Sequence, residues 1–180
     1  MKAFETVSRR LVLDLGPRLK VETHEVRLPD GRLVSDWPWV VTRDYIIVLP
    51  RVREGKFLVF RQAKYAVDGL SLAPVGGYIE AGEPPAEAAR RELLEETGHQ
   101  AGRWTALGSF RVGGNHGVGT AHLFLAEETV QVREPDSDDV EEQEWVWLDR
   151  DKLKSALLAG EFKVLAWSAA VSLALLVTSP

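Results

Sequence analysis

The stretch GGYIEAGEPPAEAARRELLEETG, residues Gly76–Gly98, is the most informative segment of this chain for its fold and function. It opens with a glycine pair, which permits unusual backbone angles or the close approach of a ligand. The residues that follow predict a helix over residues 85–97. Pro85 fits the first helical turn, where its missing N–H costs nothing, and Gly98 fits the position directly after a helix.

Three glutamates share one face of this predicted helix. Glu92, Glu95 and Glu96 lie at i, i+3 and i+4, a spacing that makes helical residues neighbours. Their like charges repel one another, and a divalent cation would offset the repulsion, because Mg²⁺ binds carboxylate oxygens and shares its shell with water and substrate phosphates. The alternative is a solvated acidic face neutralised by Arg90 and Arg91.

The order of fixed residues in this stretch resembles the Nudix box, G-x5-E-x7-R-E-U-x-E-E-x-G-U, where U is bulky and apolar. Every fixed residue is present, Leu93 fills the first U position and His99 stands at the last. A pattern with so many fixed positions is specific, and the chain is identified as resembling the Nudix hydrolases.

The resemblance implies the metal site and its support. Mg²⁺, with Mn²⁺ as a substitute, would be bound by four groups: the Gly76 carbonyl, Glu92, Glu95 and Glu96, of which Glu92 and Glu96 are the principal and catalytic ones. Glu83 would pair with Arg91 and hold the preceding loop against the helix. Gly77 would permit the turn from loop to helix.

Segments outside the box resemble the ADP-ribose and nucleoside-diphosphate-sugar pyrophosphatases of this family. Residues 61–65, RQAKY, are similar to their RQYR segment, which implies that Arg61 and Lys64 bind phosphate or the distal sugar. His122–Ala126 matches their HLFLA strand. Two loops depart from the subfamily pattern, Ala73–Gly77 and the glycine-rich Val112–Thr120, so the identity of the group attached to the nucleotide stays open.

A second acidic cluster over residues 134–144 holds seven carboxylates and resembles the acidic loop of the same subfamily. There, one loop carboxylate near the metals helps to activate water. An ungapped alignment assigns that role to Asp139, with Glu141 or Glu142 as alternatives. The other interpretation is a solvated acidic turn.

Aromatic and histidine side chains are weaker candidates. Trp37 and Trp39 lie at i and i+2 of a predicted strand, where they would stack on a nucleobase or pack on a sheet face. His116, in the loop Gly113–Gly119, is a further candidate for a substrate contact. The other histidines are expected to be structural or exposed: His24, His99 and His122.

The remaining pattern predicts an α/β (α+β) fold. Strands are expected over residues 19–28, 34–41, 45–50, 56–62, 104–111, 120–126 and 144–148, and helices over residues 85–97, 149–160 and 164–177. The resemblance implies a Nudix-like α/β/α sandwich with a mixed sheet. It also implies an N-terminal strand subdomain over residues 1–45 that serves dimerisation, and a hydrolase domain over residues 46–180.

Composition excludes several classes of protein. The 180 residues carry a net charge of -5 and no cysteine, which excludes disulfide scaffolds, zinc fingers, iron–sulfur clusters and thiol enzymes. It also excludes the Cys-dependent isopentenyl diphosphate isomerase of the Nudix fold. The acidic balance disfavours a nucleic-acid partner.

No membrane partner is expected. The N-terminus lacks an apolar signal segment, and the apolar run over residues 164–177 is too short to span a bilayer. We therefore expect a cytoplasmic location and, from the resemblance, a homodimer.

The sequence thus predicts Mg²⁺-dependent hydrolysis of the diphosphate bond of a nucleoside diphosphate linked to a group X, with ADP-ribose or another nucleoside-diphosphate sugar as the first candidate. The products would be a nucleoside monophosphate and phosphorylated X. The alternatives are a catalytically inactive Nudix-fold nucleotide sensor, or a hydrolase of (d)NTPs or dinucleotides.

Overall fold

The computed structural model describes residues 3–136 and 142–178. The chain forms two compact units. One comprises Met1–Asp44 with Phe110–Thr120, and the other comprises Tyr45–Ser109 with Ala121–Pro180. The sequence placed the boundary at residue 45, and the structure adds the excursion over residues 110–120 to the N-terminal unit.

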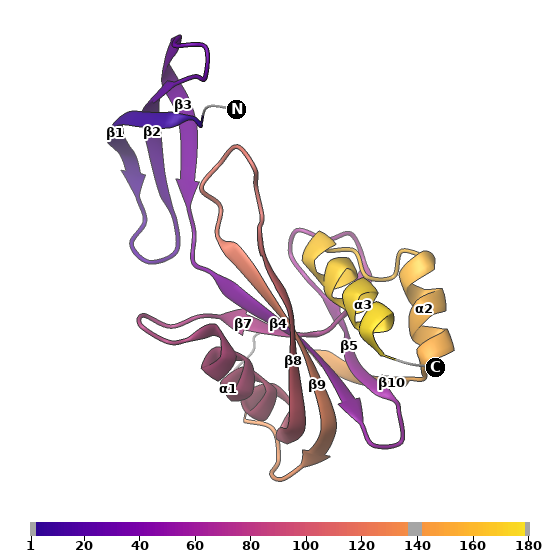
Figure 1. Cartoon of the computed structure of the whole chain (residues 1–180). Coiled ribbons are helices and arrows are strands. Elements are labelled where there is room, and N and C mark those ends of the chain that lie inside the picture. The colour runs from indigo at the N-terminus through magenta and orange to yellow at the C-terminus, as the bar shows by residue number, and fades with distance from the viewer. Residues whose placement is uncertain (1–2, 137–141, 179–180) are drawn as a thin grey trace. The chain divides into compact units, whose positions relative to one another are not determined.

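The N-terminal unit contains an antiparallel sheet in the order β1-β2-β3, drawn in indigo and purple in Figure 1. Its strands are β1 (Glu5–Asp14), β2 (Lys20–Arg27) and β3 (Leu33–Val41). The turn between β2 and β3 contains Gly31 at φ 92, a value that favours glycine. The sequence did not predict β1. All ten of its residues are exposed, so the strand lacks the alternation of buried and exposed positions from which a strand is predicted.

The larger unit is built on a seven-stranded sheet with the order β10-β5-β4-β9-β8, to which β6 is added on β5 and β7 on β4. The strands are β4 (Tyr45–Val52), β5 (Phe57–Ala63), β6 (Leu70–Ala73), β7 (Val75–Tyr78), β8 (His99–Arg111), β9 (Thr120–Gln131) and β10 (Gln143–Leu148). Strand β4 is parallel to β9 and antiparallel to β5 and β7. The predicted mixed sheet is therefore confirmed.

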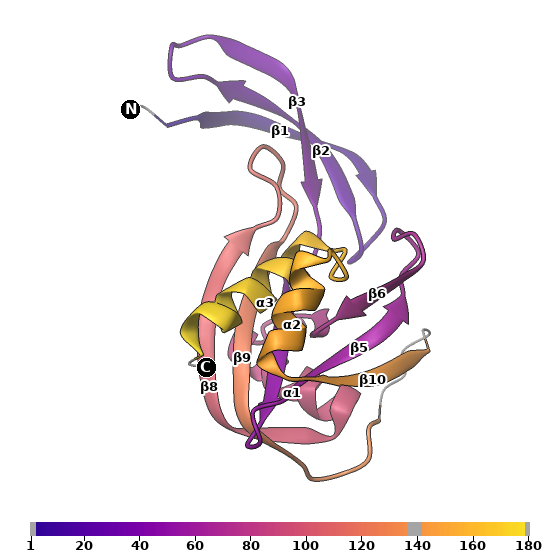
Figure 2. The same ribbon diagram turned by 90° about the vertical axis from the view of Figure 1, so that its right-hand side faces the viewer.

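Helices cover both faces of this sheet, as Figures 1 and 2 show. α1 (Pro85–Thr97) packs on one face and α2 (Arg150–Leu158) and α3 (Leu165–Val177) on the other. Strand β4 explains how: Ile46 and Val48 face the α1 side, whereas Ile47 and Leu49 face the α2 and α3 side. A strand buried on both faces is apolar without interruption, which accounts for the run over residues 45–50.

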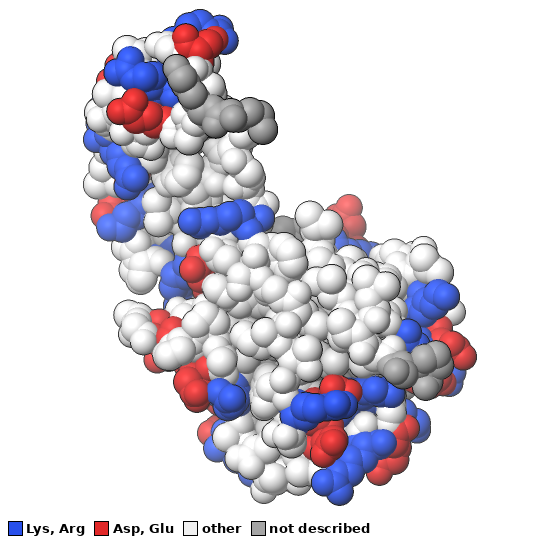
Figure 3. All heavy atoms as spheres, in the orientation of Figure 1, with Lys and Arg blue, Asp and Glu red and all other residues white. Residues whose placement is uncertain are grey.

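The C-terminal helices begin as the sequence indicates. The Asp149 side chain accepts a hydrogen bond from the Lys152 backbone N–H at 2.8 Å, which caps the first turn of α2. α3 buries Trp167, Ala170 and Val171 against the sheet, and its outer side contributes to the broad uncharged face in Figure 3. None of the helices in the described residues is long and apolar enough to cross a membrane.

One expectation about local structure was wrong. No strand was expected at the glycine pair, and Gly77 was expected in a turn, but the pair lies within β7, where Gly76 and Gly77 pair with Ile47 and Ile46 of β4. The pairing brings the backbone of this strand next to α1. Glycine therefore serves here for close approach, because a Cβ at Gly77 would overlap the Glu92 carboxylate.

Replacing Leu153 by alanine tests the packing of α2. Leu153 is completely buried, whereas Leu158 on the same helix is 78% exposed. Leu153→Ala is expected to lower the free energy of unfolding by about 2–5 kcal/mol, because it removes buried methyl groups and leaves a cavity. Leu158→Ala, the matched control, should change it by less than about 0.5 kcal/mol. Urea denaturation measures both, and equal effects would contradict the described packing.

Candidate functional site

The side chains of the glutamate-rich segment are presented by α1 and by the loop before it. Pro84 and Pro85 open the helix, and Gly98 ends it in the left-handed conformation, with its N–H bonded to the Leu94 carbonyl at 2.9 Å. Ala88, Ala89 and Leu93 anchor the helix on the sheet. Because helical residues at i+3 and i+4 share a face, this anchoring fixes where the glutamates project.

Arg91 is the centre of an ion-pair network. Its guanidinium makes two hydrogen bonds to Glu83, both of 2.9 Å, and donates to the Tyr78 carbonyl at 3.1 Å. The same group contacts Glu92 at 2.8 Å and Glu95 at 3.0 Å. It thus ties the loop after β7 to two successive turns of α1.

The network shifts the titration of its members in opposite directions. Hydrogen bonds from Arg91 lower the pKa of the Glu83 carboxyl, and partial burial opposes this only in part. The Glu83 carboxylate in turn raises the pKa of Arg91, assisted by Glu92 and Glu95. Both groups are therefore held in their charged forms across the neutral range.

The carboxylates differ in their exposure to solvent. Glu92 and Glu96 are mostly buried, with the Glu92 side chain 13% exposed, whereas Glu95 is 41% exposed. One guanidinium faces three carboxylates, Glu83, Glu92 and Glu95, so negative charge remains in excess. Burial makes this excess costly unless another cation compensates it.

The donor set suits a divalent metal ion. Buried carboxylate oxygens next to a glycine backbone are hard ligands of the type that Mg²⁺ and Mn²⁺ prefer, and the bare Gly77 Cα leaves space that a Cβ would take from Glu92. Within the described part of the chain, however, no three His, Asp or Glu side chains are gathered closely enough to hold a metal ion. Arg91 occupies the position between Glu92 and Glu95 instead.

The acidic loop leaves β9 beside the end of α1. The Gly98 carbonyl accepts from the Val132 N–H at 2.8 Å, and the Glu95 carbonyl accepts from the Asp136 N–H at 2.8 Å. Asp139 and Glu141 lie outside the described residues. Glu142 is exposed and directly precedes β10.

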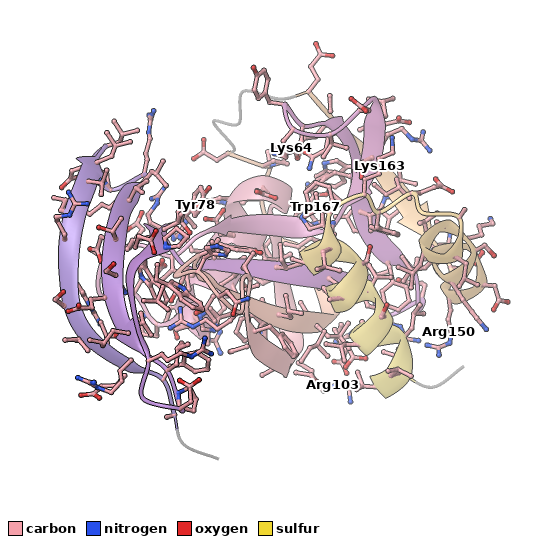
Figure 4. The ribbon with its side chains drawn as sticks, turned by 90° about the horizontal axis from the view of Figure 1, so that it is seen from above. Lys64, Tyr78, Arg103, Arg150, Lys163 and Trp167 are labelled. Atoms are coloured by element: carbon pink, nitrogen blue, oxygen red, sulfur yellow. The ribbon has the colours of Figure 1, made fainter. Side chains whose placement is uncertain are left out.

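Arg61 and Lys64 lie on and just after β5. Arg61 is exposed and pairs with Glu144 of β10 at 3.1 Å, directly opposite it in the strand register. Lys64 is half-buried and projects from the turn that follows the strand, as labelled in Figure 4.

Comparison with known proteins assigns this architecture. The NUDIX domain family matches residues 41–168, well over half of the chain. The chain belongs to the Nudix family. It is 29% identical to an ADP-ribose pyrophosphatase of Bacillus subtilis (strain 168) over 159 residues, which cover 87% of this chain and 84% of that protein. The network around Arg91 is thus the interior of a Nudix box in a Nudix pyrophosphatase.

The chain has two further similarities to known proteins. It is 28% identical to a methanol dehydrogenase activator of Bacillus methanolicus over 111 residues, which cover 62% of this chain and 60% of that protein. The solved structure described as "Crystal structure of ADP compounds hydrolase" superposes with a TM-score of 0.82 at 19% identity, over 97% of this chain and 93% of that one. The fold is therefore that of a Nudix hydrolase, as the sequence predicted.

The two tryptophans have partners inside the N-terminal unit. The Trp37 indole N–H donates to the Asn115 carbonyl at 2.7 Å. Trp39 stacks on buried His24 at 4.8 Å between ring centroids, and the Gly117 backbone lies so close that a Cβ there would overlap the indole. Both rings therefore hold the glycine-rich loop, and their stacking on a nucleobase stays a prediction.

The histidines occupy three kinds of environment. His99, at the apolar position of the Nudix box, is buried beside Trp145 and Trp147, with ring centroids 5.7 and 6.1 Å away, and its Nδ1 bonds to the Thr97 carbonyl. His122 is half-buried and bonds to Ser109. His116 is exposed in the glycine-rich loop, where a contact with substrate stays a prediction.

Two elements of the site escaped the sequence. The Tyr78 carbonyl, which Arg91 binds, belongs to the backbone and leaves no signature in the side-chain pattern. The pairing of Glu144 with Arg61 depends on the register of β10 on β5, and the two residues are 83 positions apart in the sequence. A search for charges of opposite sign on adjacent strands could have proposed it.

Glu83→Gln tests the network. The free energy of unfolding at neutral pH is expected to fall by about 2 kcal/mol, because neutral hydrogen bonds replace charge-assisted ones to Arg91. The pKa of Glu83 is lowered in the folded state. The difference in free energy of unfolding between the wild type and Glu83→Gln is thus complete above the unfolded-state pKa of ~4.3. It is lost as the pH falls through the pKa of Glu83 in the folded state.

Urea unfolding at neutral pH and at about pH 3 measures this pH dependence. Glu87→Gln is the matched control, because Glu87 lies on the same helix and pairs with exposed Arg90 at 2.8 Å. An equal loss in both variants, or a loss from Glu83→Gln that does not shrink in acid, would contradict the role of the pair.

Proposed function

We propose that this Nudix pyrophosphatase hydrolyses the diphosphate bond of a nucleoside diphosphate linked to X, in a reaction that depends on Mg²⁺ or Mn²⁺, with ADP-ribose as the first candidate and other nucleoside-diphosphate sugars next. The products are a nucleoside monophosphate and phosphorylated X. The observation that carries the proposal is the excess of carboxylates around one guanidinium, beside a glycine strand, in the box of a Nudix domain.

The groups that would hold the cation are Glu92, Glu95, Glu96 and the Gly76 carbonyl. When bound there, a divalent cation would neutralise the diphosphate oxygens and lower the pKa of a coordinated water. The Arg91 guanidinium would retain Glu83 and yield its bonds to Glu92 and Glu95, because its bidentate pair with Glu83 uses separate N–H groups. The box then keeps its shape while its carboxylates change partner.

The acidic loop would supply the proton acceptor. Asp139 and Glu141 remain candidates from the sequence, and exposed Glu142 is the one that the structure describes. A carboxylate within hydrogen-bond reach of the attacking water would take its proton. The attachment of the loop to the Glu95 and Gly98 carbonyls limits how far its first residues can move from α1.

Arg61 and Lys64 would bind the phosphates or the distal sugar. A guanidinium binds phosphate oxygens with the same paired N–H groups that it uses for a carboxylate. Arg61 can therefore release the Glu144 carboxylate and bind a phosphate of the substrate. The Bacillus subtilis relative supports ADP-ribose as the substrate, because that protein is described as an ADP-ribose pyrophosphatase.

A phosphate-release screen tests the substrate. The purified chain is incubated with Mg²⁺ or Mn²⁺ and, separately, with ADP-ribose, ADP-glucose, GDP-mannose, NADH, dinucleoside polyphosphates and dNTPs, and a phosphatase converts the monoester products to free phosphate. We expect the highest kcat/KM for ADP-ribose or another nucleoside-diphosphate sugar. Preference for dNTPs or dinucleotides would replace this proposal with the alternative hydrolase, and no release from any compound would favour a nucleotide sensor.

Replacing Glu96 by glutamine tests the catalytic role of the box. Turnover at saturating Mg²⁺ is expected to fall by more than about a hundredfold, because even partners outside the ligand shell typically cost 10–100-fold. The fold should persist, since the amide retains the shape of the side chain. Glu87→Gln controls for charge removal from the same helix. Unchanged turnover in Glu96→Gln, measured alongside an unchanged circular dichroism spectrum, would sink the assignment.

We further propose that the chain is a cytoplasmic homodimer joined through residues 1–45, with a nucleotide-type small molecule and no nucleic acid as partner. A three-stranded sheet needs a packed hydrophobic face for independent stability. Its strands β1 and β3 expose Leu11, Leu13 and Leu33, each at least 44% accessible. Sedimentation velocity measures the assembly, and a monomer at all concentrations would contradict it.

A further inference from the structure

Two adjoining cavities lie in the larger unit, away from the Nudix box. The first has a volume of about 340 Å³ and the second about 410 Å³, and both are lined by Arg51, Arg103 and Glu127. Thr105 and Thr178 also line the first cavity and Arg53 lines the second. Cavities of several hundred Å³ accommodate small metabolites.

The cavities open on the side of the sheet opposite to α1. Leu125, which lines the first cavity, belongs to the core under α2 and α3, and Glu127 follows it by two residues on the same strand, so both side chains point to that face. Figure 4 labels Arg103 and Arg150 on either side of the C-terminal turn of α3. A ligand here would be separated from the Nudix box by the sheet.

The cavity walls carry an excess of positive charge. The Glu127 side chain, 9% exposed, pairs with Arg51 at 3.4 Å and with Arg103 at 2.9 Å. One carboxylate therefore neutralises only one of these two guanidinium charges. Arg53 makes no ion pair within the described residues, and Glu128, which is exposed, is the second acid at the cavities. Three arginines against two acids is notable in a chain of net charge -5.

Arg51 and Glu127 form a preorganised base for this site. Arg51 is 23% exposed, lies over the Phe57 ring at 5.4 Å and donates to the Gly55 carbonyl at 3.5 Å. Its position is therefore fixed before any ligand binds, which lowers the entropic cost of binding. Arg103, 62% exposed, retains N–H donors that point to solvent.

Arg150 does not belong to this set. It donates to the Leu175 carbonyl and to the Thr178 hydroxyl, both at 2.6 Å, and thus caps the end of α3. The Thr178 hydroxyl itself donates to the Ala174 carbonyl at 2.8 Å. Strand β8 lines the first cavity with Arg103 and Thr105, so the Thr105 hydroxyl is a second polar group on that strand.

We propose that these cavities bind the phosphate group of a small phosphorylated metabolite, a phosphomonoester. The guanidinium forks of Arg53 and Arg103 match phosphate oxygens in geometry and charge, and the Thr105 hydroxyl donates a further hydrogen bond. Leu125 and Val177 provide an apolar wall for the remainder of the ligand. The volume exceeds that of a phosphate ion, so an organic ester fits better than phosphate alone. The site is independent of the reaction proposed for the Nudix box.

Isothermal titration calorimetry on the full chain in EDTA tests the site. The probes are inorganic phosphate, ribose 5-phosphate and AMP, with ribose and adenosine as unphosphorylated counterparts. We expect the phosphorylated compounds to bind, the esters more tightly than phosphate, and the unphosphorylated ones not to bind. Binding of no phosphorylated probe, or equal binding of ribose and ribose 5-phosphate, would overturn the proposal.

Variants locate the binding. Arg53→Gln and Arg103→Gln should each weaken ester binding about tenfold, the loss of one charge-assisted contact, and the double variant should abolish it. Lys154→Gln removes a positive charge from the exposed side of α2 and should leave affinity unchanged, as should Glu96→Gln in the Nudix box. Because Arg103 pairs with buried Glu127, Arg53→Gln, on an exposed turn, decides the matter if Arg103→Gln fails to fold.

Binding that survives Arg53→Gln and is lost in Glu96→Gln would place the ligand in the Nudix box and overturn the proposal. Failure of the phosphate-release screen leaves this result unaffected, because the titrations contain no metal and follow no turnover. The two proposals therefore fail separately.

Discussion

The Glu83–Arg91 ion pair is the constraint on which the carboxylate face of α1 depends. Glu83 comes from a loop and Arg91 from the second turn of α1, and their two hydrogen bonds fix one against the other. The guanidinium has N–H groups left for Glu92, Glu95 and the Tyr78 carbonyl. A single arginine thus holds strand, loop and helix together while it partly neutralises the carboxylates that make the site acidic.

The sheet allows this acidic face to exist by separating it from the opposite side. Its central strand β4 is buried on both faces, so that α1 and the α2–α3 pair rest on different apolar layers. Carboxylates gather on the α1 side, and three arginines line the two adjoining cavities on the other. The net charge of the chain therefore conceals two local environments of opposite sign.

In both units, glycines leave room for a large side chain beside the backbone. In β7, Gly77 gives the Glu92 carboxylate room beside the strand, and in the N-terminal unit Gly117 gives the same room to the Trp39 ring. In each case a bulky or charged side chain needs space that a Cβ would occupy. The glycine-rich loop, which lacks the pattern of a phosphate-binding loop, thus has a packing function against the tryptophans.

The box helix over Pro85–Thr97, the apolar strands of the central sheet and the Nudix assignment were all predictable from the sequence, because periodicity, helix ends and residue spacing are local properties. The sequence by itself did not determine β1, which lacks buried alternation, or the strand pairing of Gly76 and Gly77 with β4. The contact of Glu144 with Arg61 and the gathering of Arg51, Arg53 and Arg103 around Glu127 also required the tertiary structure. These features join residues distant in sequence, and only strand register and helix packing decide which distant residues meet.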